Sequence, residues 1–396
     1  MHLVQELTDY IIDFLHDDRK TLIQVSLVSR AWVGRTRPHL CGTMKITRRK
    51  VLSLDPSYLT PLCRYVKILH FTWPTEIFDP HVALDCFQRS ELDTLVVLSW
   101  ELHHLSETTR RCFAKFPCAS ITTLELNHVS STPNTLLALL PLFPNVDDLS
   151  ISVDRWWSDV DSTVEPGHGP LVTGDSHNQV RQPISTPRFR GSFKYNPHSF
   201  RSLSSPSNEP LYTLAALPLQ FQTISLKIVE QSWPGALTFL NSCSKTVRKV
   251  FVETATCCKS QPSHPCADSY VYSTCECVAD GPINWTPINF VNLEELRLSK
   301  WNSGTQCVFC NVHPLIQSLA SPCLQRVVLE AKGATIWCSH LDEDLVSLVE
   351  RHKAHGSLIV QLSTVAPPQD VRRLLPRICQ TGALEVRHSK RPDYRV

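Results

Sequence analysis

Apolar residues recur with a helical period at the start of the chain. Leu7, Ile11, Ile12 and Leu15 fall at the spacing of one helical face, with polar residues between them. The polar run at residues 16–18 ends the pattern. These positions predict a first amphipathic helix.

Two further short helices are predicted downstream of the first. Apolar residues between Thr21 and Val28 indicate the second helix, and the third begins near Ser29, where the hydroxyl can cap its first turn. The third helix runs through Trp32 towards Pro38. A unit of this size is marginally stable alone, so we expect several of its aliphatic side chains to remain exposed for a partner.

From residue 66 onward the pattern changes to short strand-like pieces of the form apolar-x-x-apolar-x-apolar. Clear copies occupy residues 66–71, 92–97, 121–126, 146–151, 221–226, 247–252, 293–298 and 324–329, and weaker ones lie at 190–195 and around residues 360–362. The fourth residues of the clear copies are separated by 26, 29, 25, 75, 26, 46 and 31 positions. Most of these gaps match the period of roughly 20–29 residues that is typical of leucine-rich repeats.

Helix-like pieces lie between the predicted strands, for example at residues 134–140, 236–241, 314–319 and 342–352. Strand plus helix at this period predicts an α/β chain stacked into a curved solenoid with a parallel sheet on its concave side. The asparagine expected in a regular repeat is mostly missing, which indicates a degenerate array. An ordinary α/β domain with alternating elements remains the alternative.

The two long gaps predict insertions at about residues 156–210 and 256–290. The first is rich in proline, and residues 158–183 have almost no apolar period, so we expect a mobile loop there. Residues 188–195 are basic with interleaved aromatic residues, a composition that can bind single-stranded nucleic acid. An amphipathic strand of the array is the favoured interpretation of that segment.

Composition narrows the class of partner. The 39 Lys and Arg nearly balance the 37 Asp and Glu, so no nucleic-acid partner is predicted. The N-terminus lacks a secretory signal and no apolar run is long enough to cross a bilayer, so no membrane partner is expected either. A cytoplasmic or nuclear location with reduced thiols is the interpretation that follows for the 16 Cys.

A cysteine cluster in the second insertion raises the question of zinc. Its members are Cys257, Cys258, Cys266, Cys275 and Cys277, followed by Cys307, Cys310 and His313. Only the last pair of cysteines has the Cys-x-x-Cys spacing that suits a tetrahedral zinc site. We predict free thiols, no metal and no other cofactor, with a zinc-stabilised binding module as an alternative.

Catalytic motifs are absent from the sequence. It holds no Gly-x-Ser-x-Gly elbow, no His-Glu-x-x-His helix and no Gly-Lys-Ser/Thr phosphate loop. His103, His104, Glu107 and Cys112 lie close together but lack an oxyanion device or a binding loop. We therefore predict a protein that is not an enzyme, with no catalytic and no cofactor-binding residue.

The N-terminal segment resembles the F-box motif, in the form common in mushroom-forming fungi. The match comprises residues 3–7, 11–18, Leu22 and 27–32, and Val4 stands where the family usually has proline. The resemblance implies docking on the Skp-type adaptor of an SCF-type cullin–RING ubiquitin ligase. It assigns adaptor binding to Leu3, Val4, Leu7, Ile11, Leu15, Leu22, Val25 and Trp32, with Glu6 and Arg30 at the rim.

The predicted organisation is an F-box over residues 1–45, a degenerate leucine-rich-repeat domain over 46–386 and a basic C-terminal tail over 387–396. The resemblance implies a non-catalytic substrate-recognition adaptor, in which the F-box recruits the ligase and the repeats hold a protein target of unspecified identity. A repeat-based interaction scaffold that engages no ubiquitin ligase is the alternative from another functional class.

Overall fold

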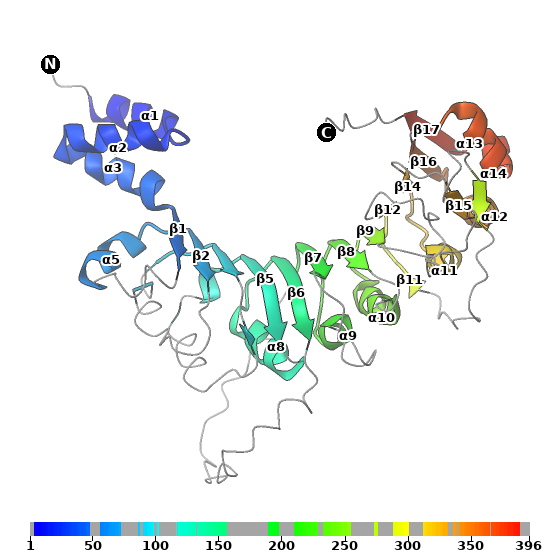
Figure 1. The fold of residues 1–396 in the computed structure, drawn as a ribbon, viewed down its shortest axis with the longest axis horizontal. Helices are drawn as coiled ribbons and strands as arrows, with labels where there is room; N and C mark the ends of the chain where they lie inside the picture. The colour runs from blue at the N-terminus through cyan, green and yellow to red at the C-terminus, as the bar shows by residue number, and fades with distance from the viewer. Residues whose placement is uncertain are drawn as a thin grey trace, which may run out of the picture. The chain divides into compact units, whose positions relative to one another are not determined.

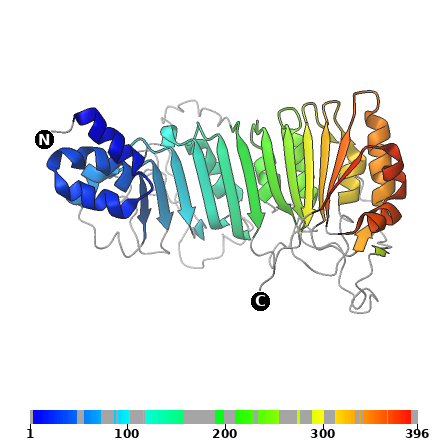
Figure 2. The same ribbon diagram turned by 90° about the horizontal axis from the view of Figure 1, so that it is seen from above.

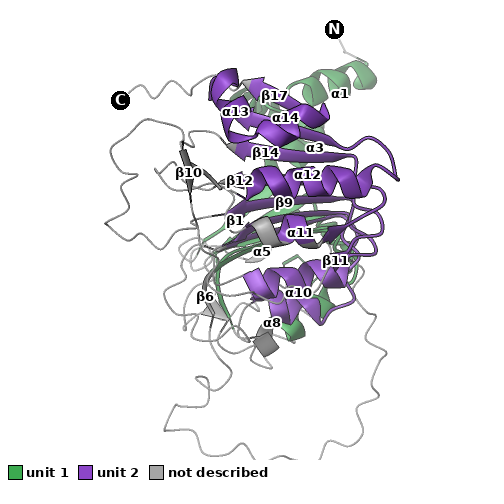
Figure 3. Cartoon of the chain, turned by 90° about the vertical axis from the view of Figure 1, so that its right-hand side faces the viewer, with its two compact units in different colours: residues 1–188, 198–202 green, residues 189–197, 203–396 purple. Residues whose placement is uncertain are grey.

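The chain forms a mixed α/β structure in two compact units. The computed structural model describes residues 4–47, 56–72, 86–87, 90–98, 101–102, 116, 118–131, 133–156, 189–197, 210–228, 233–254, 273–275, 288–300, 312–331, 336–338, 340–364 and 366–388. Unit 1 comprises residues 1–188 and 198–202, and unit 2 comprises residues 189–197 and 203–396 (Figure 3). The predicted α/β class, with N-terminal helices and parallel strands, is confirmed.

Three helices open unit 1 (Figure 1). They are α1 (Gln5–Phe14), α2 (Arg19–Val28) and α3 (Arg30–Cys41). Ser29 caps α3 as predicted, because its Oγ accepts a hydrogen bond from the Ala31 amide at 3.3 Å. Asp18 caps α2 and accepts from the Thr21 amide at 3.1 Å. The third helix is longer than predicted, since it continues past Pro38 to Cys41.

A parallel sheet follows α3 in unit 1. Its strands in spatial order are β1 (Thr43–Ile46), β2 (Ile68–Thr72), β3 (Thr94–Leu98), β5 (Thr123–Ser131) and β6 (Asp148–Trp156), and β4 (Glu101–Leu102) also pairs with β5. Between strands lie α5 (Pro56–Cys63), η1 (Cys118–Ser120), α8 (Pro133–Leu139) and η2 (Leu140–Leu142). Strand β1 was not predicted from the sequence.

Unit 2 repeats the arrangement with a second run of parallel strands. In spatial order these are β7 (Ser192–Pro197), β8 (Thr223–Ile228), β9 (Lys249–Thr254), β12 (Glu295–Lys300), β14 (Arg326–Ala331), β16 (Ile359–Thr364) and β17 (Leu384–His388). Two short parallel pairs join β10 (Ser273–Cys275) to β15 (Ile336–Cys338) and β11 (Ile288–Asn289) to β13 (Leu319–Ala320).

The helices of unit 2 alternate with its strands. They are α9 (Pro210–Ala215), α10 (Trp233–Cys243), α11 (His313–Ser318), α12 (Leu341–His352), α13 (Pro368–Leu374) and α14 (Pro376–Thr381). Phe193 of β7 and Phe239 of α10 are both fully buried, with ring centroids 4.6 Å apart. Part of the core of this unit therefore lies between its sheet and α10, and α9, α11 and α12 also bury apolar side chains. Among the described residues, no helix is long and apolar enough to cross a membrane.

The sheet register aligns the apolar pattern of the sequence. An observed strand begins at the third residue of each clear strand-like piece. The fourth residues then lie directly opposite one another. In unit 1 they form the column Leu69, Leu95, Leu124 and Leu149, which Met44 of β1 extends. In unit 2 they form the column Ile224, Val250, Leu296 and Val327, which Phe193 of β7 extends on one side and Val360 and Leu384 extend on the other. Figure 2 shows the strands of each unit side by side.

A backbone hydrogen bond recurs at the start of successive strands. The carbonyl of Gln222 accepts from the amides of both Arg248 and Lys249, and the carbonyl of Arg248 accepts from both Glu294 and Glu295. The same two-to-one pattern occurs in unit 1, where the carbonyls of residues 42, 67, 93 and 122 are the acceptors. The repeat in the sequence is thus a repeat of backbone geometry.

Polar side chains connect successive strand entries in place of the missing asparagine pattern. Their bonds run from Asn145 Nδ2 to the Ala119 carbonyl (2.7 Å), Thr246 Oγ1 to Phe221 (3.1 Å), Asn292 Nδ2 to Lys245 (2.7 Å) and Ser321 Oγ to Leu293 (3.0 Å). The two asparagines reach the carbonyl two residues before the preceding strand-like piece, and the two hydroxyls reach the carbonyl of its first residue, so neighbouring repeats are linked by different side chains at nearby positions.

Several predicted features lie outside the described residues. These are the loop at 158–183, residues 389–396 of the basic tail, and all the cysteines of the second insertion except Cys275. Arg387 and His388, assigned to the tail, lie in β17.

Candidate functional site

Exposed apolar side chains are concentrated at the N-terminus. Among the described residues the large exposed hydrophobic side chains are those of Val4, Leu7, Tyr10, Ile11, Phe14, Ile23, Leu27, Val28 and Val291. The eight that lie between Val4 and Val28 are termed here the exposed apolar set. Apolar side chains gathered in one small part of a chain indicate an interaction site.

The geometry of α1 explains the first half of the set. Val4, Leu7, Ile11 and Phe14 recur at steps of three, four and three residues, so they share one side of the helix. Their exposed fractions run from 43% to 78%. The core-facing side of α1 is instead formed by Thr8 and Ile12, at 4% and 1% exposure. The predicted amphipathic face is therefore divided, with Ile12 buried and Leu7 and Ile11 exposed.

The second half of the set lies on α2. Ile23 and Leu27 are one helical turn apart, and Val28 is the last residue of the helix. Their exposed fractions are 44%, 82% and 68%. Leu22, which lies next to Ile23, is 1% exposed and belongs to the core of the three helices.

The structure separates the sequence-predicted adaptor residues by exposure. Val4, Glu6, Leu7, Ile11 and Arg30 are exposed, Leu15, Val25 and Trp32 are partly exposed, Leu22 is buried, and Leu3 lies outside the described residues. In the structure of the chain alone, Leu22 packs in the core beneath the exposed apolar set and has almost no accessible area for contact with a partner.

Five members of the exposed apolar set were not among the predicted site residues. They are Tyr10, Phe14, Ile23, Leu27 and Val28. Phe14 and Tyr10 continue the outward side of α1, and the three-four-three spacing from Val4 was a signal that could have identified Phe14. Ile23 has no comparable signal, because Leu22 and Ile23 are equally apolar and only the packing decides which is buried.

An ionic cluster fixes the end of α1 on α3. Arg35 donates through Nε to Asp13 Oδ1 at 2.8 Å and through Nη2 to Asp13 Oδ2, so the contact is a two-bond fork. His39 Nε2 lies 2.9 Å from Asp13 Oδ1. The hydrogen bonds from Arg35 first, and then from His39, lower the pKa of Asp13 to about 2. Asp13 is therefore ionised at neutral pH.

The face of the unit 2 sheet opposite the core carries charged and aromatic side chains. Glu253 pairs with Lys227 at 3.6 Å, and Glu330 pairs with Arg297, whose guanidinium carbon lies 6.0 Å from the ring centroid of Phe251. These residues alternate along their strands with buried members of the register columns. This face presents polar groups of both charge signs.

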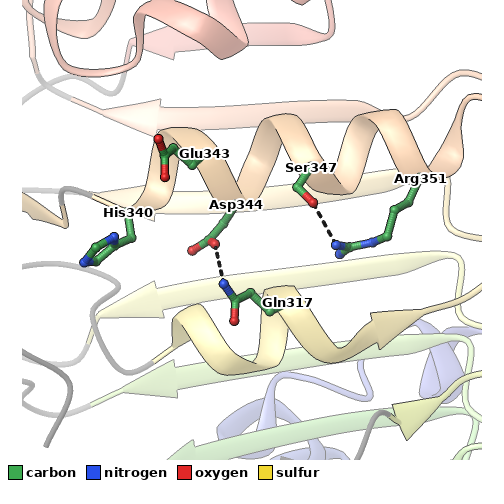
Figure 4. Close-up of a pocket in the computed structure, with 6 residues that line it drawn as sticks. All are labelled: Gln317, His340, Glu343, Asp344, Ser347 and Arg351. Carbon is green, nitrogen blue, oxygen red and sulfur yellow. Dashed lines mark hydrogen bonds between the residues drawn. The ribbon is translucent and has the colours of Figure 1, made fainter. Parts of the chain in front are cut away.

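A polar depression of about 390 Å³ lies between α11 and α12 (Figure 4). Its lining residues are Gln317, His340, Glu343, Asp344, Ser347 and Arg351. Gln317 donates to Asp344 Oδ1 at 3.2 Å, and Arg351 donates to Ser347 Oγ at 2.9 Å and to the Ile316 carbonyl at 3.0 Å. Since the Gln317–Asp344 and Arg351–Ile316 bonds join α11 to α12, these groups serve the packing of the two helices.

The described cysteines do not assemble a metal site. The described part of the chain contains no group of three or more His, Cys, Asp or Glu side chains placed to hold a metal ion. Burial raises the pKa of Cys63, Cys118 and Cys243 to about 12, which makes these thiols poor ligands and poor nucleophiles.

Comparison with known proteins assigns no family: no protein-family model matches the chain, and no curated protein matches it significantly. The exposed apolar set on α1 and α2 is the candidate functional site.

Proposed function

We propose that the chain is a non-catalytic substrate-recognition adaptor of an SCF-type cullin–RING ubiquitin ligase. In this role the three N-terminal helices are an F-box that binds the Skp-type adaptor, and the parallel repeats form a degenerate leucine-rich-repeat solenoid that holds a protein target. The chain would raise the effective concentration of a target lysine near the charged ubiquitin-conjugating enzyme and would form or break no covalent bond itself.

The exposed apolar set is the observation that carries the proposal. Six of its eight members fall on residues that resemble the F-box motif, at residues 3–7, 11–18, 22 and 27–32, and Tyr10 and Ile23 lie directly beside those residues. Burying one such side chain fully stabilises a complex by roughly 1.5–3 kcal/mol. Four of them on one side of α1, together with the members on α2, supply the apolar area that a protein partner would cover, and the entropic cost of association offsets part of this gain.

The repeat geometry supports the second half of the proposal. Strands spaced about 25–30 residues apart lie in register as neighbours, and the two-to-one backbone bond recurs between them. The face of the unit 2 sheet opposite the core offers charged and aromatic groups to a protein target. These groups are Lys227, Phe251, Glu253, Arg297 and Glu330.

Co-purification with the ligase tests this function. The tagged full-length chain should recover the Skp-type adaptor and the cullin, and the variant with both Leu7→Asp and Ile11→Asp should lose them. Two charges in a desolvated interface cost several kcal/mol. Both positions are exposed enough to accept aspartate without entering the core formed by Ile12 and Leu22.

A matched control adds the same two charges elsewhere. Gln325→Asp with Gln380→Asp changes two exposed residues of unit 2 and should leave recovery unchanged. If the chain recovers neither ligase subunit, the interaction scaffold without a ligase becomes the better description.

A further inference from the structure

Helix α1 is attached to the rest of unit 1 through a small set of contacts. Its buried side chains are Thr8 and Ile12, and Thr8 Oγ1 bonds within the helix to the Val4 carbonyl at 3.4 Å. The long-range polar contacts of α1 converge on Asp13, which receives both Arg35 and His39 from α3. Asp13 and Ile12 therefore lie together at the junction of α1 with α3.

The position of Asp13 links this junction to the exposed apolar set. Asp13 lies between Ile12, which is 1% exposed, and Phe14, which is 78% exposed. Arg35 and His39 are four residues apart on α3, so one helical face supplies both partners. The planar guanidinium fork allows only a narrow range of directions for the carboxylate, which fixes the rotation of α1 about its own axis.

Stability alone does not account for three bonds on one half-exposed carboxylate. The Asp13 and Arg35 side chains are 39% and 45% exposed, and ion pairs with this exposure add little to the free energy of unfolding. The bonds to Asp13 instead restrict the orientation of α1. A rotation of α1 would move Leu7, Ile11 and Phe14 relative to α2.

We propose that Asp13, held by Arg35 and His39, is a positioning residue for adaptor binding. It sets the rotation of α1 on α3 and so places the α1 members of the exposed apolar set in the arrangement that the adaptor recognises. This inference rests on the proposed function. It adds to that function a polar residue that controls adaptor affinity without being a member of the exposed apolar set.

Binding measurements on the purified full-length chain test the proposal. Asp13→Ala should weaken affinity for the Skp-type adaptor by about tenfold, while the thermal midpoint stays close to that of the wild type. Asp17→Ala is the matched control: Asp17 follows the same helix, pairs with His16 at 3.0 Å in solvent and is 92% exposed. The control should bind as the wild type does.

Charge reversal separates positioning from a general loss of structure. Arg35→Asp alone places two carboxylates together and should also weaken binding to the adaptor. Arg35→Asp combined with Asp13→Arg exchanges the two side chains and so restores an ion pair between the same two positions. The double variant should recover most of the wild-type affinity. Recovery would not occur if the residues contacted the adaptor individually.

Hydrogen exchange provides a readout that needs no adaptor. Amides of residues 5–14 should exchange faster in Asp13→Ala, while those of α2 and α3 keep their protection. Unchanged exchange in α1, affinity of Asp13→Ala within twofold of the wild type, or failure of the double variant to recover binding would each overturn the inference. If the wild type itself does not bind the adaptor, the proposed function fails, and exchange alone decides whether Asp13 orients α1.

Discussion

Leu296 lies directly opposite Val250 on the neighbouring strand, although 46 residues separate the two in the sequence. Val250 in turn faces Ile224, which is 26 residues earlier. The chain between β9 and β12 is therefore longer than the chain between β8 and β9, yet the register is the same. A longer connection has little thermodynamic cost, at about 0.6 kcal/mol per doubling of its length, so the strand pattern tolerates the insertion.

The buried side chains of the register column in unit 2 should contribute most to its free energy of unfolding. Leu296 is 1% exposed, and Leu296→Ala should lower the free energy of unfolding by about 2–5 kcal/mol, because it removes buried methyl groups and leaves a cavity. Lys249→Ala changes the exposed residue that precedes Val250 and should stay within about 0.5 kcal/mol of the wild type. Denaturant unfolding measures both, and equal effects would contradict the assignment of the columns to the core.

The Asp13 cluster predicts a specific acid dependence. The folded-state pKa of Asp13 is lowered from the ordinary value of 3.8 to about 2. Its stabilising contribution is therefore fully present above about pH 4 and is lost as the pH falls towards 2. Because the pair is half-exposed, the difference in thermal midpoint between the wild type and Asp13→Asn should be small, and it should shrink further as the pH falls from 4 towards 2. A difference that is as large at pH 2 as at pH 7 would rule out the ionised carboxylate as its source.

Buried thiols should resist alkylation in the native protein. Burial raises the pKa of Cys118 and Cys243 to about 12, so these thiols stay protonated at pH 8. Cys323 is exposed and should react before Cys118 and Cys243. Peptide mass spectrometry after brief iodoacetamide treatment distinguishes them, and denaturant should make all three reactive. Rapid native labelling of Cys243 would show that its burial is wrong.

Metal content is expected to be low. The spacing of the cysteines in the second insertion suits a closed four-ligand site poorly, so the purified protein should carry less than one zinc per chain. Elemental analysis measures this directly. One tightly held zinc that disappears in the variant with Cys307→Ser and Cys310→Ser would establish the zinc-stabilised module instead.

The parallel strands could be predicted because their signal is local and repeated. The apolar pattern of a piece such as residues 121–126 is enough to place β5, and the similar spacing of several such pieces predicts that they pair in parallel. Strand β1 was missed because Thr43–Ile46 is too short to show a period. Its place in the sheet depends on pairing with β2, which is a non-local contact.

The candidate site could be predicted only in part. The helical period identified α1, but it assigned Leu7, Ile11 and Ile12 to a single face, whereas tertiary packing buries Ile12 and leaves the other two exposed. The contact of Asp13 with Arg35 crosses 22 residues between two helices, and no sequence pattern encodes the rotation that brings them together. Composition did not identify Asp13 or Arg35 as part of a functional site.

Titration of the purified full-length chain with the purified Skp-type adaptor tests the central claim most directly. Calorimetry should give a one-to-one complex with a Kd of about 1 μM or tighter, and the Leu7→Asp, Ile11→Asp variant should give no measurable heat while its unit 2 control binds normally. An absence of binding by the wild type at roughly a hundredfold higher concentration, or equal binding by the double variant, would contradict the assignment of the exposed apolar set as an adaptor-docking surface.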